Sequence, residues 1–298
     1  MATEGSPILC LNGRFVTEDE ACLSPLDRGF TLADGVFETM VAHHGNVFRL
    51  DDHLQRLEQA AHVLGIPLPS SYDLADAVCD TLYRNDLEWA IVRLTVSRGM
   101  SQRRGLDVPQ NVFPTVVVRV VRWQGPPKDN FSVCHLALSS TPLNEQSPLS
   151  RLKSLAYLEK VLARQIAHVS GETDALFLNT RGFVACASSS NIFVVLDGVL
   201  ATPSISDGAL PGIARRTILT EAHRLGMVVS ERSLALEEVV HADEVFLTNV
   251  AAIVPVTMVD RKSVGKGTIG PVTSELLRAY WGLVRQIYQR DCPSTAPI

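Results

Sequence analysis

Lysine is scarce in this chain of 298 residues, and one lysine stands where an amine could do chemistry. Lys153 follows a short polar loop at 147–150 and precedes the apolar segment 155–158, so we predict that it lies where a loop meets a helix. Inside a desolvated cleft the pKa of a lysine falls, and the neutral amine can attack an aldehyde. Taken alone, Lys153 is explained at least as well by a solvent-exposed position.

Three other segments could bind an anion. Residues 210–216 open a predicted helix, and backbone N–H groups at a helix start beside Gly212 form an anion cradle. Arg56 lies in an amphipathic helix, from which its guanidinium could bind a phosphate through two hydrogen bonds. Residues 188–191 supply hydroxyl and amide groups in a turn before a strand. Each segment alone also fits an ordinary helix entry, a solvated arginine or a serine-rich turn.

The first 122 residues are predicted to mix strands and helices. We expect a hairpin over 8–16 because Asn12-Gly13 is a favoured two-residue turn between apolar stretches. A helix that Asp51 or Asp52 caps and that Gly65 ends would place Leu54, Leu57, Ala61 and Leu64 on one face. The other predicted elements are strands at 36–41, 90–97 and 115–123 and a helix at 73–86.

Residues 123–130 are the best candidate for an interdomain linker because they are polar and rich in Pro and Gly. We therefore predict a mixed α/β chain with a small N-terminal domain over 1–122 and a larger C-terminal domain over 131–298. The elements expected after the linker are strands at 131–138, 174–179, 191–196, 227–231, 244–248 and 253–259, and helices at about 154–170, 212–225 and 271–290.

Composition excludes several classes of protein. Hydrophobic residues make up 46% and charged residues 20%, which suits a folded core and not a disordered chain. A net charge of -5 without a Lys/Arg run argues against a nucleic-acid partner, and no apolar run is long enough to span a bilayer. The six cysteines are scattered and the start of the chain lacks a signal-peptide pattern, so we expect a cytoplasmic protein with no disulfide framework and no metal site.

Eight short motifs follow one another along nearly the whole chain, at 27–30, 34–39, 53–57, 153–155, 188–193, 197–200, 210–213 and 244–248. Together they resemble the class IV aminotransferases, which are fold-type IV enzymes that depend on pyridoxal 5′-phosphate (PLP). The family includes D-amino-acid aminotransferase, branched-chain aminotransferase and 4-amino-4-deoxychorismate lyase. Each motif is weak alone, but their order is specific.

The resemblance implies a role for each motif. Lys153 would form a Schiff base with the PLP aldehyde and then move a proton between the substrate Cα and the cofactor C4′. The phosphate would be bound by Arg56 and, beside Gly212, by the backbone N–H groups of Ile213 and Ala214. The family usually has threonine at the position of Ala214, so one hydroxyl contact is missing here.

The resemblance also implies contacts to the rest of the cofactor and to the substrate. Leu210 would pack against the pyridine ring, and Phe37 matches an aromatic residue of the substrate pocket. Arg103 or Arg104 falls where D-amino-acid aminotransferases have an arginine that binds the substrate carboxylate. The remaining expected cofactor contacts come from Ser189, Ser190, Asn191, Thr248 and Asn249.

One position departs from the family pattern. Cys186 stands where family members usually have a glutamate that hydrogen-bonds the pyridine nitrogen. A carboxylate keeps that nitrogen protonated and makes the ring a strong electron sink, whereas a neutral thiol is a weak hydrogen-bond partner. Either the ring of this protein is a weaker electron sink, or Cys186 is only a small buried residue and the partner comes from elsewhere.

Three functions remain open at this point. The first is amino-group transfer between an amino acid and a 2-oxo acid, through a Schiff base on Lys153. The second is elimination of the 4-amino-4-deoxychorismate lyase type, which tolerates a weaker electron sink. The third is a PLP-binding protein with weakened or no catalysis, which Cys186 and Ala214 suggest. The resemblance further implies a homodimer.

Overall fold

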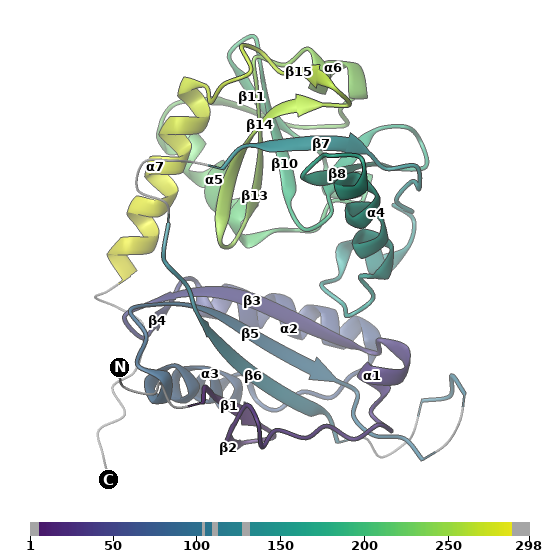
Figure 1. The fold of residues 1–298 in the computed structure, drawn as a ribbon, viewed down its shortest axis with the longest axis vertical. Helices are drawn as coiled ribbons and strands as arrows, with labels where there is room; N and C mark the ends of the chain where they lie inside the picture. The colour runs from purple at the N-terminus through teal and green to yellow at the C-terminus, as the bar shows by residue number, and fades with distance from the viewer. Residues whose placement is uncertain (1–5, 103–104, 109–112, 127–131, 288–298) are drawn as a thin grey trace. The chain divides into compact units, whose positions relative to one another are not determined.

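The computed structural model describes residues 6–102, 105–108, 113–126 and 132–287. They fall into two compact units, each with its own sheet (Figure 1). Unit 1 contains Met1–Gly125, Lys153–Ala156 and Val284–Ile298, and unit 2 contains Pro126–Leu152 and Tyr157–Leu283. The predicted mixed α/β architecture is confirmed, while the exact domain limits stay a prediction.

Unit 1 is built on a six-stranded antiparallel sheet in the order β2-β1-β6-β5-β3-β4. The predicted hairpin is present, and Asn12 and Gly13 turn it with φ angles of 52° and 78°, as a type I′ turn requires. The strands are β1 (Ile8–Leu11), β2 (Arg14–Thr17), β3 (Gly35–His43), β4 (Asn46–Val47), β5 (Trp89–Ser97) and β6 (Thr115–Arg122).

Two long helices cover this sheet. Helix α2 buries Leu54, Leu57 and Ala61 against β3 and ends at Gly65, whose left-handed backbone caps it as predicted. Helix α3 packs against β1, β6 and α2. The helices of this unit are α1 (Arg28–Leu32), α2 (Leu50–Leu64) and α3 (Ser71–Asn85).

Unit 2 is built on a mixed sheet in the order β12-β11-β10-β13-β14-β7-β8-β9, with β15 paired to β14. Its central strands are buried on both faces, and Phe193 and Phe246 stack across the β10–β13 pair at 5.1 Å. The strands are β7 (Cys134–Leu138), β8 (Asp174–Leu178), β9 (Val184–Ala187), β10 (Asn191–Leu196), β11 (Val199–Thr202), β12 (Val228–Glu231), β13 (Glu244–Asn249), β14 (Ala252–Val259) and β15 (Lys262–Ser263).

Helices pack on this sheet at both ends. Helix α4 lies on β7 and β8, and α5 lies on β12 and β13. The helices are α4 (Leu158–Val169), α5 (Ile213–Arg224), α6 (Leu236–Val240) and α7 (Pro271–Gln286), with short 3-10 turns η1 (Pro148–Arg151) and η2 (Ile205–Asp207). Within the described ranges no helix has the length and apolar character needed to cross a membrane.

Two helix predictions are wrong at the start of the helix. Helix α2 begins at Leu50, so Arg49 and not Asp51 or Asp52 is its N-cap residue. Helix α4 begins at Leu158 and not near residue 154, because the preceding residues are extended and pair with β3. The amide of Phe37 donates to the Lys153 carbonyl, and the amide of Leu155 donates to the Gly35 carbonyl, both at 2.9 Å. These bonds satisfy the backbone of 153–155 in place of a helical turn.

Candidate active site

The backbone of Lys153 is fixed in unit 1 by strand pairing. The short strand β4 pairs only with the far end of β3, and the segment from Lys153 to Leu155 pairs with its near end, between Gly35 and Phe37. Lys153 is half-buried there. A lysine held by strand hydrogen bonds presents its amine from a fixed origin, unlike a lysine in a loose loop.

The Phe37 ring is in contact with two basic side chains. The Lys153 Nζ is 4.7 Å from the ring centroid, and the Arg93 guanidinium carbon is 3.8 Å from it. Arg93 is on β5 and pairs with Thr39, so it shares the sheet face of Phe37. Two cations beside one aromatic ring form an electropositive wall that suits an anionic ligand.

The next residue of β3 begins a buried polar cluster. Glu38 is fully buried, and both of its carboxylate oxygens accept hydrogen bonds from Arg56, from Nε at 2.7 Å and from Nη2 at 2.6 Å. The Nδ1 atom of buried His53 lies 2.7 Å from the same carboxylate. Arg56 and His53 come from α2, where their spacing of three residues places them on one helix face.

The pKa values in this cluster follow from its contacts. Burial alone would raise the pKa of Glu38, but hydrogen bonds from His53 and Arg56 and their charges hold it at about 2. Burial lowers the pKa of His53, although Glu38 opposes this effect. We infer that Arg56 carries the positive charge that balances Glu38, while His53 is neutral and donates from Nδ1. The Nε2 atom of His53 is buried and has no hydrogen-bond partner among the described residues.

In unit 2, the start of helix α5 is shaped by one close contact. Gly212 is the N-cap residue of this 12-residue helix, and no side chain caps its first turn. A Cβ atom at position 212 would lie 2.1 Å from the Asn191 Oδ1, so any other residue there would have to displace the Asn191 amide. Asn191 in turn donates from Nδ2 to the Leu210 carbonyl at 2.9 Å. Asn191 therefore fixes the loop from Leu210 to Gly212 and leaves the amides of the first turn without a capping side chain.

A buried hydroxyl lies beside this helix start. Thr248 on β13 is the cross-strand partner of Asn191, and its Oγ1 is buried without any hydrogen-bond partner in the described residues. The Thr248 hydroxyl and the uncapped amides of the first turn of α5 are all hydrogen-bond donors without a partner of their own within the described ranges. Such a group of donors suits a bound phosphate. Asn249 donates from Nδ2 to the Ser190 Oγ at 3.1 Å, so its amide is tied to the serine turn.

A buried carboxylate holds the loop that leads to this helix. Asp207 is fully buried at the end of η2 and accepts hydrogen bonds from Ser233 at 2.9 Å, from Asn179 at 3.3 Å and from Arg181. Gly208 follows with a φ of 96°, which a side chain would strain. The network fixes the direction in which the chain enters Leu210.

Cys186 on β9 is buried among apolar side chains. Its neighbours are Ala163, Ala167 and Phe177, and only 4% of its surface is exposed. Burial raises the pKa of its thiol, so the group stays neutral at ordinary pH. The Cys186 thiol is therefore uncharged, as expected from the sequence.

The predicted site residues fall into two sets. Phe37, Arg56 and Lys153 belong to unit 1, whereas the expected ligands from Cys186 to Asn249 belong to unit 2. In unit 2 the structure brings together Asn191, Leu210, Gly212 and Thr248, while Ser189 is exposed. Arg103 and Arg104 lie outside the described residues.

Sequence reasoning gave no role to several residues that hold these sets in place. They are Glu38, His53, Arg93 and Asp207, which the structure ties to predicted site residues or to their loop. Glu38 lies beside Phe37 in a recognised motif, and His53 lies three residues before Arg56. That spacing was a usable signal for the cluster, whereas nothing local marks Arg93 or Asp207.

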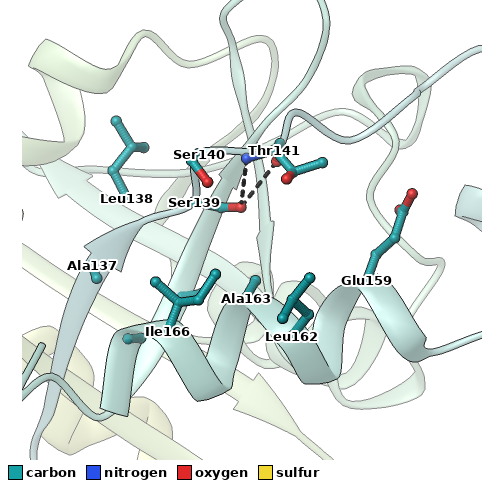
Figure 2. Close-up of a pocket in the computed structure, with 11 residues that line it drawn as sticks. Ala137, Leu138, Ser139, Ser140, Thr141, Glu159, Leu162, Ala163 and Ile166 are labelled. Carbon is teal, nitrogen blue, oxygen red and sulfur yellow. Dashed lines mark hydrogen bonds between the residues drawn. The ribbon is translucent and has the colours of Figure 1, made fainter. Parts of the chain in front are cut away.

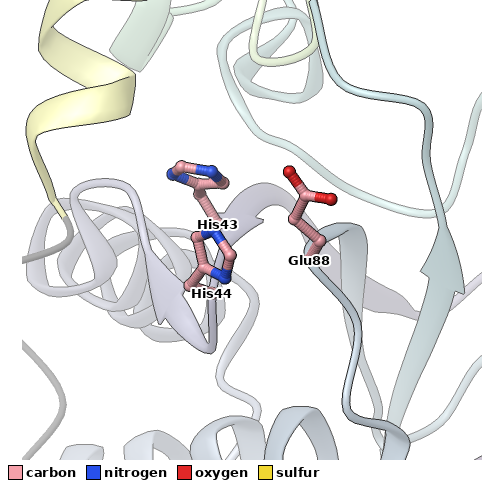
Figure 3. Close-up of side chains that lie close together, drawn as sticks. All are labelled: His43, His44 and Glu88. Carbon is pink, nitrogen blue, oxygen red and sulfur yellow. The ribbon is translucent and has the colours of Figure 1, made fainter.

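Unit 1 also contains a histidine pair near a carboxylate (Figure 3). His43 stacks on Trp89 at 3.8 Å, and burial, the main cause, lowers its pKa. The possible ligand atoms of His43, His44 and Glu88 lie within 4.8 Å of one another, compared with about 3.3 Å in a tetrahedral zinc site with bonds of about 2.0–2.1 Å. The prediction of no metal site stays a prediction.

Comparisons with known proteins identify the family. The family described as amino-transferase class IV matches residues 35–259. A curated Methanocaldococcus jannaschii protein, named as a candidate branched-chain-amino-acid aminotransferase, is 36% identical over 284 residues, which cover 92% of this chain and 97% of that protein. The Pseudomonas aeruginosa branched-chain-amino-acid aminotransferase is 34% identical over 291 residues, which cover 93% and 92% of the two chains.

A solved structure agrees with these sequence matches. The branched-chain amino acid aminotransferase from Thermobaculum terrenum in its PLP form has a TM-score of 0.85 and 29% identity, with 97% of this chain and 96% of that chain covered. The predicted fold type is thereby confirmed over nearly the full length. The chain belongs to the class IV aminotransferases, the fold-type IV PLP-dependent family that its motifs resemble.

Proposed function

We propose that this protein transfers the amino group of an aliphatic, branched-chain-type amino acid to a 2-oxo acid, with Lys153 as the residue that carries PLP. The observation that supports Lys153 most strongly is its strand-fixed backbone beside Phe37. The substrate class is supported by the names of the relatives, which act on branched-chain amino acids. The elimination alternative finds no such support among these names.

Bound PLP would supply the electron sink and the carrier of the amino group. Lys153 would act as the base that moves a proton at the substrate Cα. Arg56 and the first-turn amides of α5 at Ile213 and Ala214 would bind the phosphate, and the Thr248 hydroxyl would donate to it. Arg93 and Phe37 would face the substrate side chain or its carboxylate.

One observation keeps lyase chemistry as a second candidate. Cys186 is neutral and buried, so it cannot hold a proton on the pyridine nitrogen as a carboxylate does. Elimination also begins with loss of the Cα proton but needs no reprotonation at the cofactor, and it therefore tolerates a weaker electron sink. This candidate would act on 4-amino-4-deoxychorismate and release pyruvate and 4-aminobenzoate.

The test is a substrate panel on the full chain loaded with PLP. Valine, leucine and isoleucine with 2-oxoglutarate should yield the matching 2-oxo acids and glutamate, and Lys153→Ala should abolish this activity. Release of 4-aminobenzoate from 4-amino-4-deoxychorismate without amino transfer would favour the lyase. A normal PLP spectrum that no amino acid changes would contradict both activities and favour a catalytically silent protein.

The role of Cys186 has its own test. Cys186→Glu should raise the rate of reaction with the amino donor by roughly tenfold, which corresponds to about 1.4 kcal/mol of barrier. It should also shift the visible spectrum of bound PLP. The buried Cys134→Ala change is the matched control and should alter neither. An unchanged rate and spectrum in Cys186→Glu would show that position 186 does not contact the pyridine nitrogen.

We further propose that the protein is a homodimer, as the resemblance implies. The expected cytoplasmic location stays a prediction. Size-exclusion chromatography with light scattering tests the dimer independently of activity.

A further inference from the structure

The turn between β3 and β4 has an unusual residue in its first position. Two hairpins of unit 1 have two-residue turns in which both residues have positive φ angles, Asn12-Gly13 and His44-Gly45, the second with angles of 47° and 79°. Turns of this type favour asparagine or aspartate before glycine. Asparagine would therefore suit position 44 better than histidine, and the preference of the turn does not explain the imidazole.

The left-handed backbone of His44 brings two imidazoles together. Neighbouring residues of an extended strand point to opposite faces of the sheet. Here the ring centroids of His43 and His44 are only 4.4 Å apart, because the chain turns at position 44. His43 is fixed by stacking on Trp89, its cross-strand partner on β5, at 3.8 Å. The two imidazoles are therefore close enough to share one ligand.

A carboxylate completes the group, as Figure 3 shows. Glu88 directly precedes β5, and its carbonyl accepts a hydrogen bond from the His44 amide at 2.7 Å. The backbones of His43, His44 and Glu88 are thus held by the pairing of β3 with β5 and its continuation into the turn. Their possible ligand atoms lie within 4.8 Å of one another, and the described residues contain no other group of this kind.

The chemistry of these donors selects the ion. Two imidazole nitrogens and one carboxylate oxygen are a usual ligand set for Zn²⁺, which keeps a fourth position for water. Mg²⁺ and Ca²⁺ prefer sets of oxygen ligands. Bringing the donor atoms to the ~3.3 Å of a tetrahedral zinc site requires rotation of His44 and Glu88. Both side chains are exposed, so they can rotate without displacing packed neighbours.

Two charges act on this group in opposite directions. Burial, the main cause, lowers the pKa of His43, as do the charges of His44 and Arg285, whereas the charge of Glu88 raises it. Glu88 therefore favours a bound cation, and Arg285, which belongs to the part of α7 in unit 1, opposes it. We expect an affinity below that of a deeply buried structural zinc site.

The hollow beside helix α4 in unit 2 has a different character (Figure 2). Its volume is about 100 Å³, most of its lining side chains are alkyl groups, and Glu159 is its one charged lining residue. The Ser139 hydroxyl there already donates to the Thr141 carbonyl and accepts from the Thr141 amide. This hollow therefore offers no comparable set of ligands for a transition metal ion.

We propose that His43, His44 and Glu88 form a binding site for a divalent transition metal ion of the zinc type at the end of the β3–β4 hairpin. The expectation of no metal site rested on the scattered cysteines, and this site uses none. His43 is roughly 20 Å along β3 from Phe37, so the site is separate from the residues assigned to PLP and to the substrate. The inference goes beyond the proposed function and does not depend on it.

The test is calorimetric titration of Zn²⁺ into the untagged holo protein, freed of metal beforehand by dialysis against a chelator. The wild type should bind one Zn²⁺ per chain with a micromolar dissociation constant. His44→Asn should raise that constant at least ~10-fold, because it removes a ligand. Without metal this variant should be as stable as the wild type or more stable, because asparagine is the preferred turn residue. His62→Asn, at an exposed histidine of α2, is the matched control and should bind Zn²⁺ normally.

Two further variants test the charges around the ion. Glu88→Gln should weaken Zn²⁺ binding at least ~10-fold. Arg285→Gln should strengthen it roughly 2–5-fold, because a positive charge is removed from the surroundings. Thermal unfolding gives an independent readout: Zn²⁺ should raise the Tm of the wild type and of His62→Asn more than that of His44→Asn.

A wild type that binds no Zn²⁺ would overturn the proposal. Binding that is equally tight in His44→Asn and Glu88→Gln would overturn it as well, because the ion would then lie elsewhere, for example on PLP. Amino transfer is not among the readouts, so failure of the proposed activity and failure of this site can be distinguished.

Discussion

Arg56 binds both carboxylate oxygens of Glu38, from Nε at 2.7 Å and from Nη2 at 2.6 Å, inside the core of unit 1. The carboxylate comes from β3 and the guanidinium from α2, so this pair links the strand beside Lys153 to the helix that packs on it. The arginine that the sequence predicts as a phosphate ligand is thus held by a neighbour that sequence reasoning did not assign.

Removal of the Glu38 charge should destabilise the protein. Glu38→Gln leaves the guanidinium of Arg56 without its counter-charge in a buried site, and we expect a loss of about 3 kcal/mol in the free energy of unfolding. Urea denaturation measures it. The matched control is Glu18→Gln, which removes the partner of exposed Arg119 in the same unit and should cost at most ~1 kcal/mol. Equal losses in the two variants would contradict a buried, charge-balanced pair.

His53 should make the fold sensitive to mild acid. Its pKa is lowered in the folded state by burial, so below the ordinary value of 6.5 the unfolded chain takes up a proton that the folded chain does not. The contribution of neutral His53 to the free energy of unfolding is complete above pH 6.5. It is lost as the pH falls below that value, by about 1.4 kcal/mol per pH unit for one proton.

The variant His53→Asn isolates this effect. Its side-chain amide can still donate to Glu38 but does not titrate. Between pH 7.5 and 5, its stability should fall less steeply than that of the wild type by the contribution of one proton. Glu38, with a pKa of about 2, loses its own contribution only below its ordinary value of 4.5, outside this window. Parallel pH profiles for the two proteins would show that His53 does not titrate as we infer.

The sequence predicted the regular elements of the fold better than the contacts that build the site. The Asn12-Gly13 hairpin and the end of α2 at Gly65 were predictable because turn and cap preferences are local. The extended conformation of Lys153 was not, because its hydrogen bonds come from Phe37, more than a hundred residues away. In the sequence alone, an apolar segment after a loop has the pattern of a helix start. Its pairing with β3 can be seen only in the structure.

The contacts among the site residues of unit 2 were also not predictable from local sequence. The Leu210–Ala214 segment was predictable as a helix entry with an anion cradle. The close contact at Gly212 comes from Asn191, and the position of the unpaired Thr248 hydroxyl follows from the pairing of β10 with β13. The order of the motifs indicated that these residues belong to one site. No local sequence pattern shows which of their atoms are in contact.

Thr248→Val tests whether the orphan hydroxyl serves the phosphate. Without PLP the variant should be as stable as the wild type or more stable, because a buried unpaired hydroxyl is removed. Its dissociation constant for PLP should rise roughly 10–100-fold through loss of a hydrogen bond to a charged group. Equilibrium dialysis and urea denaturation measure the two effects.

Thr217→Val is the matched control for this change. The Thr217 hydroxyl is also buried, but it already donates to the Ile213 carbonyl at 2.9 Å. This variant should bind PLP like the wild type. If both threonine variants bound PLP normally, the hydroxyl of Thr248 would have no role in phosphate binding.

Gly212→Ala tests the shape of the helix start. The added Cβ would overlap the Asn191 Oδ1 at 2.1 Å and force that amide or the loop to move. We expect at least a roughly tenfold rise in the dissociation constant for PLP, because a shift of the first-turn amides weakens the anion site. Gly282→Ala in α7, where nothing lies within 4 Å of the new atom, should instead bind PLP normally and be slightly more stable. Normal PLP binding by Gly212→Ala would contradict the proposed phosphate position.

The amine that holds the cofactor can be identified directly. The chain has five lysines, so the holo protein can be reduced with borohydride, digested and mapped by mass spectrometry. We expect one phosphopyridoxyl group, on the peptide that contains Lys153, and none after Lys153→Ala. Attachment to another lysine of the wild type, or no covalent attachment at all, would contradict it.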